Sequence, residues 1–296
     1  MSAVPQTGQP VLLREDRDGI ATLTLNRPQQ MNLLTSEMLA ALQAAFDAIA
    51  RDASVRVVVL AATGKGFCAG HDLKEIRALG EQPKIAQLFA TCGRMMATIP
   101  KLPQPVIAKV QGAAAAAGCQ LVAQCDLAIA ADHVKFVTSG VTWGFFCSTP
   151  GVAVGRNLLR KHALEMLLTG DPVSAQQALQ WGLVNRVVTA EQLDAATAEL
   201  AAKLASKPPA TVAAGKRGFY QQMDMSLEKA YELAGQVIDE PVEHGLKFGL
   251  TNHHRSEKPT VRIFGRHGPS PAVHVESAGI SQFAIAPQLP KQRSRA

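Results

Sequence analysis

The chain has 296 residues, of which 47% are hydrophobic and 18% are charged, so it is long and apolar enough to build one large globular domain. Its net charge of +6 is unevenly placed: eight Lys/Arg and three Asp/Glu lie in residues 241–296, which leaves only +1 for the first 240 residues. A basic excess confined to one end, together with 5% aromatic residues, argues against a nucleic-acid-binding surface on the folded part.

The five cysteines are odd in number and form no CxxC pair, which favours a reducing compartment and cysteines used as small core residues. No apolar run approaches the roughly 20 residues that a membrane span requires. The first thirteen residues carry no charged side chain, so they lack both the arginines of a transit peptide and the basic start of a secretory signal. We therefore expect a cytoplasmic protein, with a mitochondrial location as the alternative.

Strands and helices alternate through the first part of the chain, which predicts an α/β core. The hairpin turn signal Asp18-Gly19 joins the first two strands, and a nearly all-apolar run reads as a parallel strand covered on both faces. The predicted elements are strands at 11–16 and 20–26, a helix at 36–50, a strand at 55–62, a helix at 85–99 and a strand within 104–112.

The stretch from Gln104 to Thr149 is predicted to organise the rest of the fold. A buried strand is followed by five alanines, Ala113 to Ala117, where a strand leads into a helix. Small side chains there allow another molecule to approach the backbone, and the first N–H groups of the helix have no intrahelical partner. That arrangement suits a developing oxyanion or a phosphate. The plainer alternative is that alanine is a good helix former in a tight core.

A second glycine-containing loop, residues 63–75, follows the apolar strand at 55–62. Its glycine spacing matches neither the dinucleotide-binding fingerprint nor the P-loop. Asp72 and Glu75 form a plausible capping pair for a following helix. Free backbone amides are therefore expected near Gly70 and His71, at the C-terminal end of a strand, where open α/β sheets usually bind their ligands.

The last third of the folded chain is predicted to be helical, apart from one strand. After two short apolar strands at 127–131 and 135–138, the predicted elements are helices at 151–168 and 174–181, a strand at 183–188, and helices at 191–204, 210–222 and 226–238. From about Asp239 the composition changes and shows no sustained period, which predicts a poorly packed tail. The pair His253-His254 has no carboxylate or cysteine at ligand spacing, so no metal site is expected.

Five motifs, in order, make the chain resemble the crotonase (enoyl-CoA hydratase/isomerase) superfamily over roughly residues 10 to 238. A narrower branch of this family is matched by the run Ala113 to Leu121 together with Phe146 to Gly151. The five motifs are Leu25-Asn26-Arg27-Pro28, Gly66-Phe67-Cys68-Ala69-Gly70-His71-Asp72-Leu73, the alanine-rich stretch through Cys125-Asp126, Leu167-Leu168-Thr169-Gly170 with Ser174-Ala175, and Ala178 to Val188.

The resemblance implies an α/β fold with a crotonase-like ββα spiral core over residues 1–190. It also implies a helical C-terminal trimerisation region over 191–238, followed here by an atypical tail over 239–296. The implied partner is an acyl-CoA thioester, and the implied assembly is a homotrimer or a dimer of trimers. Coenzyme A is part of that substrate, so no separate cofactor and no metal are expected.

Site residues follow from the resemblance by position. The backbone N–H groups of His71 and Ala117, with Gly118 adjacent, would form an oxyanion hole for the thioester carbonyl. Lys65 or Arg27 could meet phosphates of coenzyme A, and Trp143 reads as a wall of the acyl pocket. The expected substrate-binding residues are Arg27, Lys65, Phe67, Cys68, Ala69, Gly70, Asp72, Trp143 and Cys147.

Two departures from the family pattern bear on activity. Hydratases of the family use two glutamates on a water molecule, and these positions hold Gln120 and Gly140 here. An amide cannot take a proton and glycine has no side chain, so hydration by the usual route is in doubt. Asp126 matches a family aspartate that is usually structural, and a structural role is favoured for the His71 ring. Cys147 has no evident base for nucleophilic catalysis.

Two functions remain open. The chain is either an enoyl-CoA hydratase/isomerase-like enzyme of fatty acid metabolism or a nearly inactive acyl-CoA-binding protein. A serine peptidase on the related ClpP-like spiral is a weak third hypothesis, because no Ser, His and Asp stand at matching positions.

Overall fold

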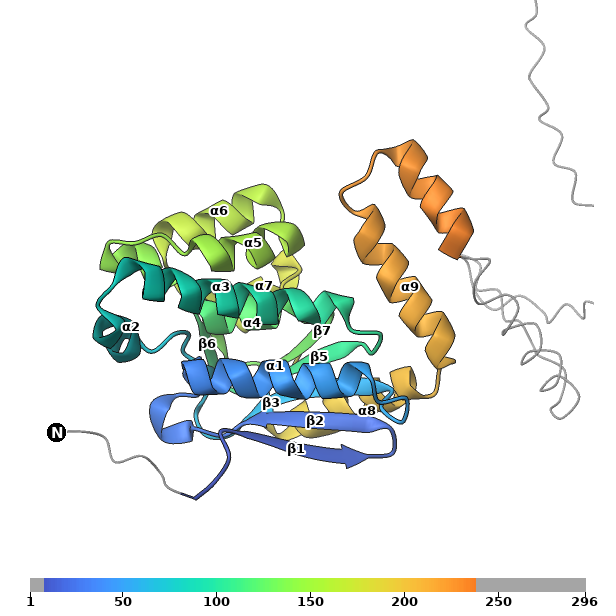
Figure 1. Ribbon diagram of the computed structural model, residues 1–296, viewed down its shortest axis with the longest axis horizontal. Coiled ribbons are helices and arrows are strands. Elements are labelled where there is room, and N and C mark those ends of the chain that lie inside the picture. The colour runs from blue at the N-terminus through green and yellow to red at the C-terminus, as the bar shows by residue number, and fades with distance from the viewer. Residues whose placement is uncertain (1–7, 238–296) are drawn as a thin grey trace, which may run out of the picture. The chain divides into compact units, whose positions relative to one another are not determined.

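The structure, a computed structural model, describes residues 8–237 (Figure 1). All of these residues belong to one compact unit. The predicted tail over 239–296 lies outside the described residues. The boundary expected at residue 190 stays a prediction.

A six-stranded sheet has the strand order β1-β2-β3-β5-β7-β10, and only its first pair is antiparallel. That pair turns at Asp18 and Gly19, whose φ angles of 52° and 76° give the twist that a two-residue hairpin needs. Both the hairpin and the parallel character of β3 were therefore predicted correctly. The strands are β1 (Leu12–Arg17), β2 (Ile20–Leu25), β3 (Val57–Ala62), β5 (Val106–Val110), β7 (Leu127–Ala131) and β10 (Arg186–Val188).

A second sheet of four short strands has the order β4-β6-β8-β9. From β3 onward the chain alternates between the two sheets: β3 is followed by β4, β5 by β6 and β7 by β8, and each pair leads into helices. This repeat is the predicted ββα spiral. The strands are β4 (Gly66–Cys68), β6 (Ala113–Ala115), β8 (Lys135–Val137) and β9 (Val173–Ser174).

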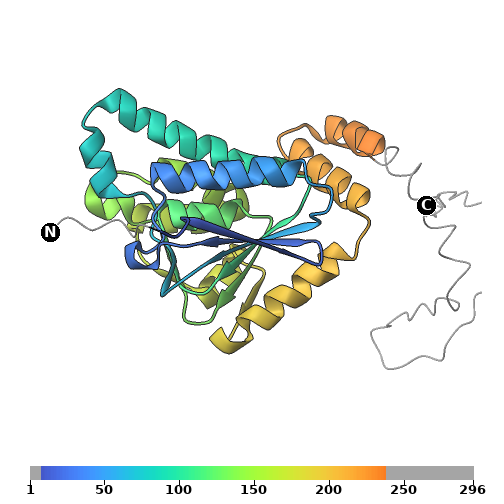
Figure 2. The same ribbon diagram turned by 60° about the horizontal axis from the view of Figure 1, so that its bottom comes forward.

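Helices cover both faces of the larger sheet, as Figure 2 shows. On one face α1 (Ser36–Ala50) and α3 (Gln82–Thr98) pack together and bury the main hydrophobic core, to which Val58 and Leu60 of β3 contribute. On the other face α8 (Leu193–Ala205) packs on β3, β5 and β7, where Val57 and Val59 meet Ala201. The all-apolar sequence of β3 thus reflects burial on both sides.

Three local predictions differ from the structure. Strands β4 and β6 were missed, because each has only three residues, too few to show side-chain alternation. The helix expected over 151–168 is two helices, α5 (Ser148–Asn157) and α6 (Arg160–Thr169), separated by extended backbone at Leu158 and Leu159. Asp72 caps α2 (Leu73–Leu79) as expected, but Glu75 accepts from the backbone N–H of Ser36 instead of completing a capping box.

The remaining helices match their predicted positions. Helix α7 ends at Gly182 in the left-handed conformation, as its sequence indicates. Within residues 8–237 no helix is both long and apolar enough to cross a bilayer. These helices are α4 (Ala117–Gln124), α7 (Ala175–Trp181), α9 (Pro209–Gln222) and a further helical stretch at 227–237.

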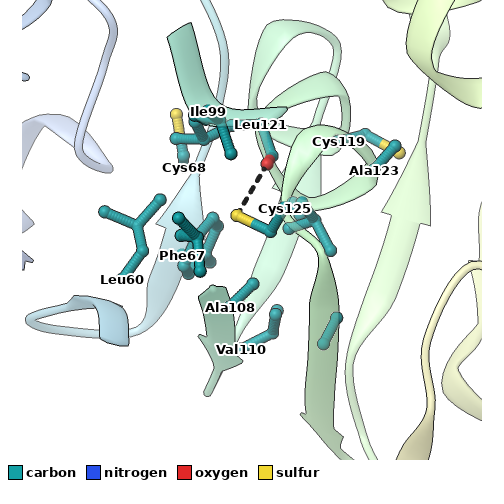
Figure 3. Close-up of a cluster of buried hydrophobic side chains, with 14 of the residues drawn as sticks. Leu60, Phe67, Cys68, Ile99, Ala108, Val110, Cys119, Leu121, Ala123 and Cys125 are labelled. Carbon is teal, nitrogen blue, oxygen red and sulfur yellow. Dashed lines mark hydrogen bonds between the residues drawn. The ribbon is translucent and has the colours of Figure 1, made fainter. Parts of the chain in front are cut away.

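All five cysteines are free thiols in buried positions, as predicted (Figure 3). Cys125 donates from its thiol to the Leu121 carbonyl at 3.2 Å, while Cys68 packs beside Phe67 in the same cluster. Burial raises the pKa of Cys68, Cys92 and Cys119 to about 12, from an ordinary value of 9.0, and it raises that of Cys125 as well.

These thiols predict alkaline instability. Above about pH 9 the unfolded chain loses thiol protons that the folded chain keeps, so the free energy of unfolding should fall as pH rises. Each buried thiol contributes a slope of up to about 1.4 kcal/mol per pH unit. A Cys92→Ala variant should therefore lose stability more slowly than the wild type between pH 9 and 10.5 in urea unfolding. Equal slopes would contradict the prediction.

Candidate active site: two adjacent backbone bends

Two bends of the chain meet because the strands before them are parallel neighbours. Strand β4 pairs with β6, with Gly66 opposite Ala113 and Cys68 opposite Ala114. Parallel neighbours end at the same edge, so the segment after β4 lies beside the segment after β6. At Gly70, whose φ is 92°, an added Cβ would lie 3.1 Å from the Ala117 nitrogen. The two bends predicted from the sequence are therefore in contact.

Glycine is required where the bends touch. A Cβ on Gly118 would lie 2.0 Å from the Cys68 carbonyl oxygen, and one on Gly112 would lie 2.0 Å from the Lys65 carbonyl oxygen. Both obstacles are backbone atoms, which cannot swing aside as a side chain does. The start of α4 consequently sits directly on the end of β4, with no side chain between them.

Ala116 forms the bend between β6 and α4 in an unusual backbone conformation, with φ 48° and ψ −117°. Its N–H donates to the Val137 carbonyl at 2.8 Å, and its carbonyl accepts from the Gln120 N–H at 3.0 Å. Non-glycine residues with positive φ are strained and concentrate at functional sites. The bend makes Ala117 the first residue of α4, so the Ala117 N–H has no intrahelical partner.

The His71 N–H is the other free donor at the junction, the place where the bend after β4 meets the bend before α4. The neighbouring residues are fixed: the Gly70 carbonyl accepts from the Leu34 N–H at 2.8 Å, and His71 pairs with Leu34 in a parallel bridge. Among residues 8–237 no acceptor is hydrogen-bonded to the His71 N–H. Two unpaired backbone donors, from His71 and Ala117, thus flank one junction at the positive end of a helix dipole.

The imidazole of His71 is held in place by protein contacts. Its Nδ1 lies 3.2 Å from the Leu34 carbonyl oxygen, and its ring packs edge-on against Phe89 of α3, with centroids 4.9 Å apart. Nε2 is buried and has no hydrogen-bond partner among the described residues. Burial lowers the pKa of His71 below its ordinary 6.5, although the Leu34 carbonyl and the charge of Glu75 act in the opposite direction.

The two positions that lack glutamate are both enclosed. Gln120 of α4 is 4% exposed, and its Oε1 has no hydrogen-bond partner within the described residues. A Cβ on Gly140 would lie 2.7 Å from Cys147 Sγ and 2.7 Å from the Phe145 carbonyl oxygen. The Gly140 N–H instead donates to Cys147 Sγ at 3.2 Å, a contact that the sequence did not reveal. The space beside residue 140 is therefore already filled.

The other expected binding residues divide into buried and exposed groups. Phe67 and Cys68 have side chains in the core, and the following Ala69 is partly buried. Lys65 is exposed at the start of the loop. Trp143 is 71% exposed, in the segment between β8 and α5.

Arg27 and Asp72 have local structural partners. The Arg27 guanidinium donates to the backbone carbonyls of Gln9, Pro10 and Asn26. Two of these carbonyls belong to the segment before β1, so Arg27 holds that segment beside the end of β2. Asp72 accepts from the Lys74 N–H as the cap of α2. Any contact of these two residues with a substrate stays a prediction.

Asp126 serves a buried network that joins α9 to the core. Its carboxylate accepts from Lys216 Nζ at 2.6 Å, from the Tyr220 hydroxyl at 2.8 Å and from the Val106 N–H at 2.7 Å. Lys216 also donates to the carbonyls of Ile99 and Gln104. The structural interpretation of Asp126 agrees with these contacts. Its partners lie 90 and 94 residues away, so no local pattern could identify them.

A separate cavity of about 330 Å³ lies near the N-terminal end of β3, between the end of α1 and the start of α9. Leu204, Val212 and Arg56 are among the residues that line it. The bends lie beyond the opposite end of β3, so this cavity is not part of the junction.

Comparisons with known proteins agree with the fold and the motifs. A family model described as enoyl-CoA hydratase/isomerase matches residues 15–260. Enoyl-CoA hydratase domain-containing protein 3, mitochondrial, from Xenopus laevis is 46% identical over 231 residues, which cover 78% of this chain and 79% of that protein. The Homo sapiens protein of the same name is 43% identical over 243 residues, covering 82% and 80%.

Solved structures give the same result. The crystal structure of an enoyl-CoA hydratase from Mycobacterium smegmatis is 50% identical, with a TM-score of 0.79, and covers 82% of this chain and 97% of that one. The crystal structure of human enoyl coenzyme A hydratase domain-containing protein 3 is 41% identical, with a TM-score of 0.80, and covers 85% and 99%.

Proposed function

The chain belongs to the enoyl-CoA hydratase/isomerase family, a family that binds acyl-CoA, and from this premise we propose that its two bends bind the thioester carbonyl of an acyl-CoA. The N–H groups of His71 and Ala117 would donate to the carbonyl oxygen and stabilise the enolate that forms there. The observation that supports the proposal is the closeness of the two bends: a Cβ added to Gly70, the residue before His71, would lie 3.1 Å from the Ala117 nitrogen.

Chemistry through an enolate fits the site better than hydration does. Adding water across a double bond needs groups that take and give protons at the water molecule. Gln120 cannot ionise, and Gly140 has its side-chain space occupied by Cys147 and Phe145. Slow or absent hydration is the consequence. Acyl-CoA binding without turnover is the second candidate, and the same two positions favour it.

Assembly and location are further parts of the proposal. Large apolar side chains are exposed along α5, α6 and the C-terminal helices, which supports burial against other copies in a homotrimer or a dimer of trimers. Examples are Val152, Leu159, Leu168, Phe219 and Leu227. The relatives from Xenopus laevis and Homo sapiens are called mitochondrial, which supports the mitochondrial alternative.

A binding and turnover experiment tests the proposal. We expect calorimetric titration with butyryl-CoA, which cannot be hydrated, to show saturable binding, because the bends offer two unpaired donors to its carbonyl. Hydration of crotonyl-CoA should stay near the background rate, since both acid–base positions lack a carboxyl group. Absence of butyryl-CoA binding would overturn the proposed function. Rapid hydration would overturn the roles given to residues 120 and 140.

A further inference from the structure

The cavity of about 330 Å³ between the end of α1 and the start of α9 takes no part in the function proposed above. Its volume lies within the range of about 300–1,000 Å³ that small-molecule sites occupy. Aliphatic side chains from two helices line it: Leu204 of α8, and Val212 and Ala213 of α9. A ligand that fits here is therefore a small molecule with an apolar part.

The same cavity is lined by three basic residues, Arg51, Arg56 and Lys207. Within the described part of the chain none of the three forms an ion pair. Asp52 is the acidic residue of the lining, and its carboxylate is already paired with Arg14 at 3.2 Å. Three positive charges against one negative charge leave the lining with a formal excess of +2. The charge that complements this cavity is therefore negative.

Hydrogen-bond donors are held in place around the cavity. One guanidinium N–H of Arg56 donates to the Lys207 carbonyl, which ties the start of β3 to the end of α8. A guanidinium has five N–H donors, so others remain for a ligand. Helix α9 begins without a side-chain cap, and the N–H of Ala210 in its first turn has no acceptor among the described residues. An anion beside Ala210 would also lie at the positive end of the α9 dipole.

Gln104 connects the cavity to the anchor of α9. It lines the cavity and is 6% exposed, its backbone carbonyl accepts from Lys216 Nζ at 2.9 Å, and its Nε2 donates to the Ile49 carbonyl at 2.9 Å. Its Oε1 has no hydrogen-bond partner within residues 8–237. An acceptor oxygen without a donor disfavours a doubly charged group deep in the cavity. A ligand with one charged end, placed toward the exposed Arg51 and Lys207, fits better.

We propose that this cavity binds a free medium-chain carboxylate, a fatty acid without coenzyme A. Its carboxylate would meet Arg51, Arg56 and Lys207, because a guanidinium binds a carboxylate through two parallel hydrogen bonds. Its alkyl chain would lie along the aliphatic wall. A thioester carbonyl carries no charge, so the cavity and the two bends would select different forms of an acyl group. The proposal does not depend on acyl-CoA binding at the bends.

Two variants remove the two halves of the proposed recognition. Arg51→Gln/Lys207→Gln removes two exposed charges whose side chains have no ion-pair partner within the described residues, and Ala213→Leu fills the space meant for the alkyl chain. The matched control is Arg160→Gln/Lys203→Gln, which removes the same two kinds of charge from exposed positions outside the lining. Thermal melts would establish that each variant is folded.

Calorimetric titration with octanoate tests the proposal on the full chain, alone and with saturating butyryl-CoA. We expect saturable octanoate binding in both cases, because the cavity lies away from the bends. Affinity should fall at least about tenfold in Arg51→Gln/Lys207→Gln and in Ala213→Leu, and stay within about twofold in the control. Octanamide, which lacks the charge, and inorganic phosphate, which lacks the chain, should each bind at least about tenfold more weakly than octanoate. Octanoate should also raise the melting temperature, since an occupant bridges α1, α8 and α9 in the folded state only.

Four results would overturn the proposal. They are no octanoate binding by the wild type, unchanged affinity in Arg51→Gln/Lys207→Gln or in Ala213→Leu, phosphate or octanamide binding as tight as that of octanoate, and displacement of octanoate by butyryl-CoA, which would assign octanoate to the bends. Failure of butyryl-CoA to bind, with octanoate binding intact, would instead remove the proposed function and leave this site standing.

Discussion

Replacing Gly118 with alanine is expected to lower the free energy of unfolding by about 3 kcal/mol or more and to abolish binding of butyryl-CoA. The added methyl group would lie 2.0 Å from the Cys68 carbonyl oxygen and 2.7 Å from its carbon. Neither atom can move without shifting β4 or α4, and forced overpacking of this kind is strongly destabilising. Separation of the two strand ends would also part the N–H groups of His71 and Ala117.

Gly155 provides the matched control. It lies in α5, and an added Cβ meets nothing within 4 Å, so Gly155→Ala should raise stability by about 0.5–1 kcal/mol through helix propensity alone. Urea unfolding and calorimetry on both variants would check the pair. If Gly118→Ala were as stable as the wild type and still bound butyryl-CoA, the close packing of the two bends would be disproved.

Much of this fold could be predicted because its core elements have strong periodicity. Helix α1 spans the predicted residues, and its buried side chains, from Met38 to Ile49, stand at helical spacing. The all-apolar run of β3 likewise indicated a strand with two covered faces. Such elements are specified by local sequence, since the side chains that bury them recur every few residues.

The candidate site could be predicted only in part, because its geometry depends on contacts between distant segments. The glycines and alanines indicated where another molecule can approach the backbone. Strands β4 and β6, which lie in the same two stretches, were nevertheless not recognised. The partners of the His71 ring, Leu34 and Phe89, belong to segments whose sequence carries no chemical signal. The contact of Cys147 with Gly140 depends on the conformation of the loop between them, and a loop has no periodic sequence pattern from which that conformation could be predicted.

The second large effect is expected at the buried ion pair. Lys216→Met should lower the free energy of unfolding by about 3–5 kcal/mol, because it leaves the Asp126 carboxylate buried without its cation. The Lys216 and Asp126 side chains are only 7% and 13% exposed, so water cannot replace the lost partner. The carbonyls of Ile99 and Gln104 also lose a donor.

A double-mutant cycle separates the charge from the packing. Asp126→Asn keeps an oxygen that can accept from the Val106 N–H, and in Lys216→Met/Asp126→Asn neither charge remains. The double variant should therefore lose less stability than the sum of the two single variants, by about 1–3 kcal/mol. Tyr220→Phe, which removes one hydrogen bond to the same carboxylate, should cost only about 1 kcal/mol in urea unfolding. If the losses of Lys216→Met and Asp126→Asn were additive, the two residues would stabilise the fold independently. The ion pair between them would then not be the interaction that holds α9 on the core.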